Sequence, residues 1–198
     1  MMEAMAQFPD LEPKGLKLNL GCGGMRIPGT KGVDQVNVGV TDVIANLDAP
    51  ALPFRAGSVA SIHCYHVLEH VDFVRLMDEF HRVLAPGGLL HLRVPHASSF
   101  CFWDDPTHIR PFTSRTFDYW TPGYHQNYGF KTKFHVLSRR LSFLGNADIN
   151  TYKFLPWLTN SIRWFIDTAA NAHIRLCERV WAQYVGGFGE IRFTLKKA

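Results

Sequence analysis

The part of the chain that most constrains its fold is a predicted helix that leads through a turn into a strand. Apolar residues recur at spacings of three and four over residues 72–84, which predicts an amphipathic helix with one buried face. The Pro-Gly-Gly turn at 86–88 ends that helix, and Leu89–Val94 predicts a strand. A β-rich run, Val59–Cys64, precedes the helix. Strand, helix, turn and strand in this order predict a right-handed parallel crossover, and therefore an α/β fold.

A glycine-rich turn follows the first predicted strand. Leu16–Leu20 reads LKLNL, an alternation typical of a strand, and the glycine-rich residues 21–24 (GCGG) end it abruptly. Glycines at the carboxyl end of a first parallel strand let the backbone approach a ligand where a Cβ would clash. A G-x-G pattern also occurs in plain tight turns, so on its own it leaves that alternative open.

Acidic residues follow the next two predicted strands. Asp34 closes a short strand at Gly32–Asp34, and Asp48 follows another at Asp42–Leu47. Because ligands of open α/β sheets bind where the strands end, Asp34 could accept hydrogen bonds from both ribose hydroxyls of a nucleoside. Asp48 could lie beside the adenine ring. Either carboxylate could instead cap a turn.

The link between the glycine turn and Asp34 is unusually short. Only the nine residues Met25–Val33 separate them, whereas a parallel crossover normally needs a dozen or more and usually contains a helix. Asp42 is therefore an alternative to Asp34 as the ribose ligand.

Several segments together resemble a known family. In chain order they are LNLGCGG, GVD, LPFRAGSVASIHCYHVLEHV and FHRVLAPGGLLHLRVP. They resemble the class I S-adenosylmethionine-dependent methyltransferases, most closely the short type-11-like branch, over about residues 16–120. The resemblance implies an α/β, Rossmann-like, doubly wound and mostly parallel sheet with helices on both faces. It also implies an enzyme that uses S-adenosylmethionine and releases S-adenosylhomocysteine.

The resemblance further implies which residues bind the cofactor: Leu20, Gly21, Cys22, Gly23, Asp34, Leu47, Asp48, His66 and Leu68. The glycine turn would wrap the methionine part and Asp34 would hold the ribose. Leu47 and Asp48 would lie on the adenine side, and residues 66–68 would form the wall beyond the fourth strand.

A loop after the Leu89–Val94 strand supplies the candidate catalytic residues. The stretch DPTHIRPFT resembles a segment of the same methyltransferase branch. His108 could remove a proton from the acceptor, because the pKa of histidine lies near neutrality. Asp105 would orient His108 or act in its place. The structural alternative is that Asp105 caps a turn and His108 packs against Trp103.

The segment HVLEH at 66–70 also matches the H-x-x-E-H pattern of inverted zinc peptidases. Two histidines four apart on a helix can ligate one metal, and Glu69 could act as a base. Here the motif follows a predicted buried strand and lies among methyltransferase motifs. The four cysteines include no C-x-x-C pair, which argues against a thiolate zinc site. We therefore expect no metal.

We expect one domain with two unequal halves. Residues 1–15 form a leader, and 16–198 form a methyltransferase domain with a cofactor-binding half (16–120) and a substrate or lid half (121–198).

The second half contains a predicted helical insertion near the C-terminus. Phe130–Leu144 predicts one or two strands, residues 157–184 predict one long helix or two shorter ones, and Glu190–Leu195 predicts a last strand. The aromatic helix could be a lid, a homodimer face or a membrane-surface helix. Its charges are mixed in sign, which favours packing.

Composition excludes some partners and leaves others open. The net charge of +4 comes without a dense basic block, so a nucleic-acid partner is permitted but not favoured. No apolar run is long enough for a transmembrane helix, and no signal peptide is evident. We expect a cytoplasmic location.

The expected function is methyl transfer to a small-molecule, sugar or lipid-linked glycan acceptor. Two alternatives stay open: a nucleic-acid methyltransferase, whose aromatic residues would stack on bases, and a non-catalytic subunit that only binds S-adenosylmethionine. A dinucleotide oxidoreductase fits poorly, since Arg26 stands where G-x-G-x-x-G needs its third glycine.

Overall fold

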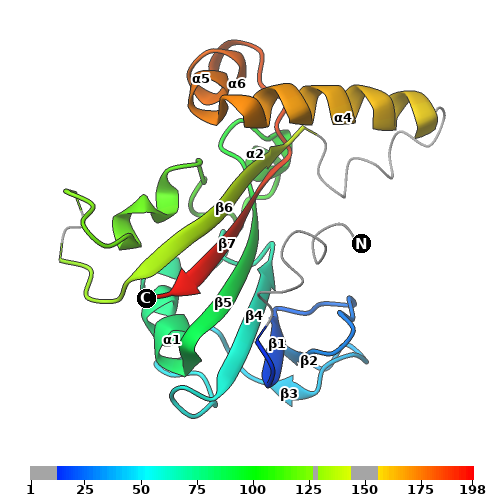
Figure 1. Cartoon of the computed structure of the whole chain (residues 1–198). Helices are drawn as coiled ribbons and strands as arrows, with labels where there is room; N and C mark the ends of the chain where they lie inside the picture. The colour runs from blue at the N-terminus through cyan, green and yellow to red at the C-terminus, as the bar shows by residue number, and fades with distance from the viewer. Residues whose placement is uncertain (1–12, 127–128, 144–155) are drawn as a thin grey trace.

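A seven-stranded mixed sheet forms the centre of the molecule (Figure 1). The computed structural model describes residues 13–126, 129–143 and 156–198. The strands are β1 (Leu16–Leu20), β2 (Lys31–Asp34), β3 (Val43–Ile44), β4 (Val59–Tyr65), β5 (Leu84–Pro95), β6 (Phe134–Ser142) and β7 (Glu190–Lys197). Their order is β3-β2-β1-β4-β5-β7-β6, with β7 antiparallel to both neighbours and the other pairs parallel. The predicted α/β, mostly parallel sheet is confirmed.

The helix of the predicted crossover is α1 (Phe73–Val83), which connects the parallel strands β4 and β5. It begins at Asp72, whose side chain accepts a hydrogen bond from the backbone N–H of Arg75 at 3.3 Å. One face is buried, and Phe80 on that face is completely inaccessible. Burying a side chain of this size contributes about 1.5–3 kcal/mol to folding. The sequence period therefore predicted both the helix and its packed face.

The two faces of the sheet differ in chemistry. Leu92 of β5 lies opposite Phe193 of β7. The ring of Phe193 packs against Phe117 of the short 3₁₀ helix η3 (Thr116–Trp120), with 4.8 Å between the ring centroids. This is the apolar face, which the core occupies. The alternate residues of the same strands point to the other face, where Arg93 lies opposite Arg192. That second face is polar.

The connections between the first three strands contain no helix. Residues 21–30 join β1 to β2 through turns alone, and β1 and β2 still pair in parallel, with Leu20 opposite Val33. The predicted strand Asp42–Leu47 is shorter than expected, because only Val43–Ile44 pairs with β2. Asn46 starts a turn there, with the Ala49 N–H donating to the Asn46 carbonyl at 3.2 Å.

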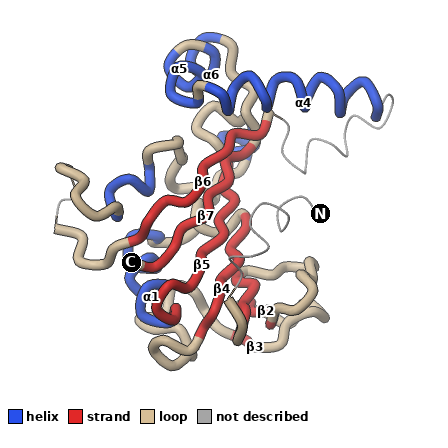
Figure 2. The backbone as a smooth tube through the Cα atoms, viewed as in Figure 1, coloured by secondary structure: helices blue, strands red, loops and turns tan. Residues whose placement is uncertain are grey.

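Three helices near the C-terminus confirm the predicted insertion: α4 (Pro156–Ala172), α5 (Ile174–Arg179) and α6 (Trp181–Tyr184). The prediction of one long helix, or two, was wrong. The chain turns after α4 so that Glu178 of α5 reaches the loop after β5, where it accepts hydrogen bonds from the Ser114 N–H at 2.5 Å and from His96 at 3.1 Å. Figure 2 shows α4 lying across the end of β6, where Asn171 bonds to the Leu141 backbone. A short helix α2 (Phe100–Asp104) lies in the loop after β5.

Candidate active site

The glycine turn lies at the carboxyl end of β1, as predicted. Gly21 and Gly23 have φ of +61° and +48°, a region that side chains with a Cβ rarely adopt. A Cβ on Gly21 would lie 2.3 Å from Cγ2 of Val67, whereas a Cβ on Gly23 would meet nothing within 4 Å. The turn is therefore packed on one side and open in front of Gly23. Leu20 and Cys22 are buried beside it.

Asp34 stands next to the glycine turn. Its Oδ2 accepts a hydrogen bond from the Gly23 N–H at 2.9 Å, and its Oδ1 accepts one from Val36 at 3.3 Å. Carboxylates keep further lone pairs when each oxygen accepts one bond, so Asp34 can still bind hydroxyl groups. The structure thus brings Asp34 and the turn together.

The alternative residue, Asp42, has structural partners. Its Oδ2 accepts a hydrogen bond from the Gly32 N–H at 2.8 Å, and Lys31 and Arg26 lie 3.5 and 3.8 Å away. The Gly32 bond, with these two cations, lowers the pKa of Asp42. This geometry favours Asp34 over Asp42 as the ribose ligand.

The segment with Leu47 and Asp48 is fixed by α1. Arg75 donates hydrogen bonds to the carbonyls of Leu47 and, at 2.6 Å, Ala49. Leu47 is buried while Asp48 is exposed, so Asp48 presents its carboxylate to solvent near the end of β3.

His66 begins the chain segment beyond β4, in a conformation unusual for a residue other than glycine (φ +55°). Its Nε2 bonds to Glu190 at 3.1 Å and its Nδ1 lies 3.4 Å from Glu69. Burial opposes the charged ring, but these two carboxylates outweigh it and raise the pKa of His66 to about 9. His66 is thus held as a cation between two buried carboxylates. Leu68 is completely buried, which places it in the core beneath the predicted cofactor wall.

The candidate catalytic residues His108 and Asp105 lie together. His108 Nδ1 donates to the Phe102 carbonyl at 2.9 Å, so the lone pair of the neutral ring is on Nε2, 3.7 Å from Asp105 Oδ2. Thr107 donates to Asp105 Oδ1 at 2.6 Å from its hydroxyl and at 2.8 Å from its N–H, and these bonds lower the pKa of Asp105. The ring of His108 stacks on Phe102, where the sequence suggested Trp103 as its packing partner.

The H-x-x-E-H segment does not form the arrangement of a zinc peptidase. His66 bonds to Glu190, while His70 bonds to Thr107 at 2.9 Å and its ring lies 4.6 Å from that of His108. Within the described ranges, one group could jointly hold a metal ion: Glu69, His70 and His108, whose ligand atoms all lie within 4.8 Å of one another.

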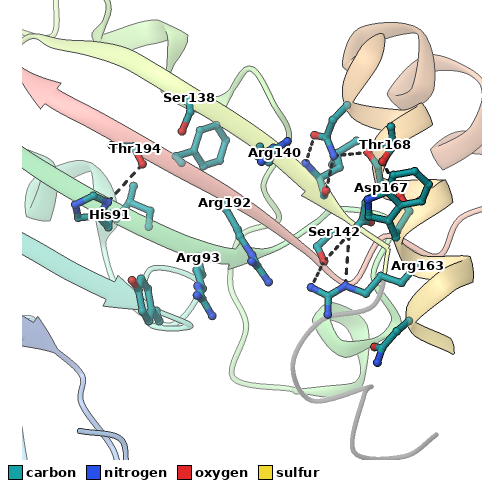
Figure 3. Close-up of a pocket in the computed structure, with 17 residues that line it drawn as sticks. His91, Arg93, Ser138, Arg140, Ser142, Arg163, Asp167, Thr168, Arg192 and Thr194 are labelled. Carbon is teal, nitrogen blue, oxygen red and sulfur yellow. Dashed lines mark hydrogen bonds and ion pairs between the residues drawn. The ribbon is translucent and has the colours of Figure 1, made fainter. Parts of the chain in front are cut away.

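Sequence reasoning missed a cavity on the polar face of the sheet (Figure 3). It has a volume of about 690 Å³ and lies between strands β4 to β7 and helix α4. Its cationic lining residues are Arg93, Arg140, Arg163 and Arg192. The one available signal was Arg93, a cation inside the apolar run LLHLRVP.

Comparison with known proteins agrees with this geometry. Residues 30–92 match the family model described as "Methyltransferase domain". A search among curated proteins gave no significant match.

Similar solved structures share the fold at low sequence identity. A SAM-dependent methyltransferase from Archaeoglobus fulgidus is 16% identical over 96% of this chain and 89% of that chain, with a TM-score of 0.54. Phosphoethanolamine N-methyltransferase 2 of Haemonchus contortus, in complex with S-adenosyl-L-methionine, is 12% identical over 98% of this chain and 52% of that chain, with a TM-score of 0.56. Geranyl diphosphate C-methyltransferase of Streptomyces coelicolor A3(2) is 12% identical over 99% of this chain and 75% of that chain, with a TM-score of 0.55. That structure is a complex with Mg²⁺, geranyl-S-thiolodiphosphate and S-adenosyl-L-homocysteine.

Residues 30–92 are thus similar to a methyltransferase domain, and the chain shares the Rossmann-like fold of solved S-adenosylmethionine-dependent methyltransferases. Among the described residues, no helix is long and apolar enough to cross a bilayer.

Proposed function

We propose that the enzyme methylates a hydroxyl or amine of a small-molecule, sugar or lipid-linked glycan acceptor. The observation that carries the proposal is the open space in front of Gly23, with the Asp34 carboxylate beside it and a large polar cavity reaching the ends of β4 and β5. The similar structure from Streptomyces coelicolor contains a small diphosphate compound, which supports a small acceptor for this fold.

The chain's own residues would bind and orient the cofactor. The backbone around Gly21 and Gly23 would contact the methionine part, and Asp34 would accept hydrogen bonds from the ribose. Asp48 would lie on the adenine side. When bound, S-adenosylmethionine supplies a methyl group activated by its sulfonium. The protein's task is then mainly to align the acceptor in line with that methyl group and to exclude water.

We propose His108 as the base that removes the acceptor's proton. Its Nε2 is the ring nitrogen left without a proton in the neutral form, and the Asp105 carboxylate at 3.7 Å would stabilise the imidazolium that forms. His70 lies against the same ring. Its Nδ1 donates to the Thr107 hydroxyl, because that hydroxyl already donates to Asp105. The loop thus holds both histidines in fixed tautomers.

Two other functions make different predictions. A nucleic-acid methyltransferase would bind RNA or DNA with a steep dependence on salt. A non-catalytic subunit would bind S-adenosylmethionine without any turnover. A screen with methyl-labelled S-adenosylmethionine across sugars, glycans, amines and nucleic acids tests all three. Label in a small acceptor supports the proposal, and label only in nucleic acid, or in no acceptor, contradicts it.

We also propose that the C-terminal helices form a homodimer interface. Trp164 and Phe165 of α4 and Tyr184 of α6 are about two-thirds exposed or more (70%, 68% and 80%), an unusual exposure for large aromatic side chains. Tyrosine and tryptophan are enriched where protein surfaces meet.

A further inference from the structure

Arg93 is a buried cation on the polar face of the sheet. Its side chain belongs to β5 and is 6% exposed, and its guanidinium carbon lies 4.5 Å above the ring of Tyr65. Among the residues that the structure describes, its guanidinium has this ring contact and no hydrogen-bond acceptor. A buried charge that lacks a hydrogen-bonded partner is costly, and strongly perturbed charged groups in clefts cluster at functional sites.

Strand register places two further arginines beside Arg93. Arg93 of β5 lies opposite Arg192 of β7, which lies opposite Arg140 of β6. Residues directly opposite one another share a face of the sheet, and like charges in that position destabilise it. We call Arg93, Arg192 and Arg140 the arginine row.

A fourth arginine reaches the row from α4. Figure 3 shows Arg93 and Arg192 extending to the same side of the sheet, with Arg163 pointing toward them from α4. Burial, and then the charge of Arg192, lower the pKa of Arg93, and Arg163 adds to this repulsion. The repulsion between these cations is therefore a property of the cavity itself.

The carboxylates near the row only partly balance it. Glu190 accepts a hydrogen bond from Arg192 at 2.5 Å, but it also binds His66. Asp167 lies 3.4 Å from Arg163. Glu69 is the second partner of His66. Among the described residues, three carboxylates therefore lie near Arg93, Arg192, Arg163 and the His66 cation, so the negative charges are fewer than the positive ones even before Arg140 is counted.

We propose that the arginine row, with Arg163, binds a phosphate or diphosphate group carried by the methyl acceptor. Neighbouring strands are about 4.8 Å apart, so successive guanidinium groups can each hold a different phosphate oxygen. Planar guanidinium groups bind phosphates through paired, charge-assisted hydrogen bonds. The row begins beside the ends of β4 and β5, which would leave the rest of the acceptor free to extend toward the cofactor edge. The acceptor part of this inference rests on the proposed function; the anion site does not.

The test is calorimetric binding of inorganic pyrophosphate to the full chain, with sulfate as a comparison anion. We expect saturable binding of pyrophosphate, at least tenfold tighter than that of sulfate. Arg140→Gln, at an exposed position, is expected to weaken it at least tenfold, and Arg93→Gln is expected to do the same. Arg55→Gln, an exposed arginine on a turn outside the cavity, is the matched control and is expected to bind as the wild type does.

A second readout is the melting temperature, measured with and without pyrophosphate. Because Arg93→Gln removes a buried charge facing like charges, its melting temperature without added anion should equal or exceed that of the wild type, and pyrophosphate should no longer raise it. Absence of pyrophosphate binding to the wild type, or an equal loss in Arg55→Gln, would overturn the inference.

Competition identifies the source of the phosphate. Uridine diphosphate and geranyl diphosphate are each added against pyrophosphate, and displacement by either supports an acceptor of that kind. If neither displaces it, substituted diphosphates do not fit and the inference fails. S-adenosylhomocysteine binding is measured in the same samples. If it is absent while pyrophosphate still binds through the row, the proposed function fails and the anion site stands.

Discussion

A β-carbon on Gly21 would lie 2.3 Å from Cγ2 of Val67, so the first strand of the sheet and the segment after β4 meet at a position that only glycine can occupy. Gly21→Ala adds this overlap to the cost of a positive φ (+61°). We expect a loss of about 2–5 kcal/mol in the free energy of unfolding, measured by urea titration. Gly23→Ala has the strained φ but no overlap, so it should lose only about 1–2 kcal/mol. It should nevertheless bind the cofactor more weakly, because its methyl group enters the open space. Equal loss of stability in both variants would contradict the steric difference between Gly21 and Gly23.

Substitutions of Asp34 and Asp42 distinguish a role in cofactor binding from a structural role. Asp34→Ala removes the carboxylate next to Gly23 and should weaken S-adenosylhomocysteine binding about 10–100-fold, since hydrogen bonds to a charged group contribute about 1.5–3 kcal/mol. Asp42→Ala removes the bond to Gly32 and should lower the melting temperature while leaving affinity within about threefold. The reverse pattern in calorimetry would assign the ribose to Asp42.

The ion pair of His66 and Glu190 gives folding stability a defined pH dependence. The pKa of His66 is raised from 6.5 to about 9. Its contribution to folding stability is therefore complete below pH 6.5 and is lost as the pH rises through 9. Burial raises the pKa of Glu190, but His66, Arg192 and Arg93 outweigh this and lower it to about 2. The contribution of Glu190 to folding stability is present above pH 4.5 and is lost as the pH falls toward 2.

Thermal melts at a series of pH values check this dependence. The wild type should lose stability between pH 6.5 and 9, and His66→Gln should lose less over that interval. Parallel curves for the two proteins would show that the pair does not titrate as described.

His108 is tested by turnover once an acceptor is known. His108→Asn should lower kcat by about 10²–10⁴-fold with KM for S-adenosylmethionine little changed, because only proton removal is lost. Asp105→Asn should shift the pH profile of kcat, since the charge beside the ring is gone. Full activity in His108→Asn would show that the acceptor needs no base.

The aromatic surface of the C-terminal helices predicts self-association. Sedimentation velocity should show a dimer for the wild type and a monomer for Phe165→Glu. Val36→Glu, at a half-exposed position (54%) near β2, is the control and should stay dimeric. A monomeric wild type would remove this proposal.

Local signals explain what the sequence could predict. The spacing of apolar residues before the Pro-Gly-Gly turn predicts α1 and its buried face, and the glycine turn with Asp34 depends on residues close together in the chain. The arginine row could not be predicted in this way, because it depends on the register between Arg93 and Arg192, about a hundred residues apart. The contact of Glu178 in α5 with Ser114 likewise joins residues that are far apart in the chain, so the sequence alone does not reveal it.

The most direct test of the central claim is calorimetry of the wild type and of Asp34→Ala with S-adenosylmethionine and S-adenosylhomocysteine. We expect the wild type to bind both compounds with one site per chain and the variant to bind both more weakly. No heat with either compound from a folded wild-type protein, or equal affinities in the two proteins, would contradict it.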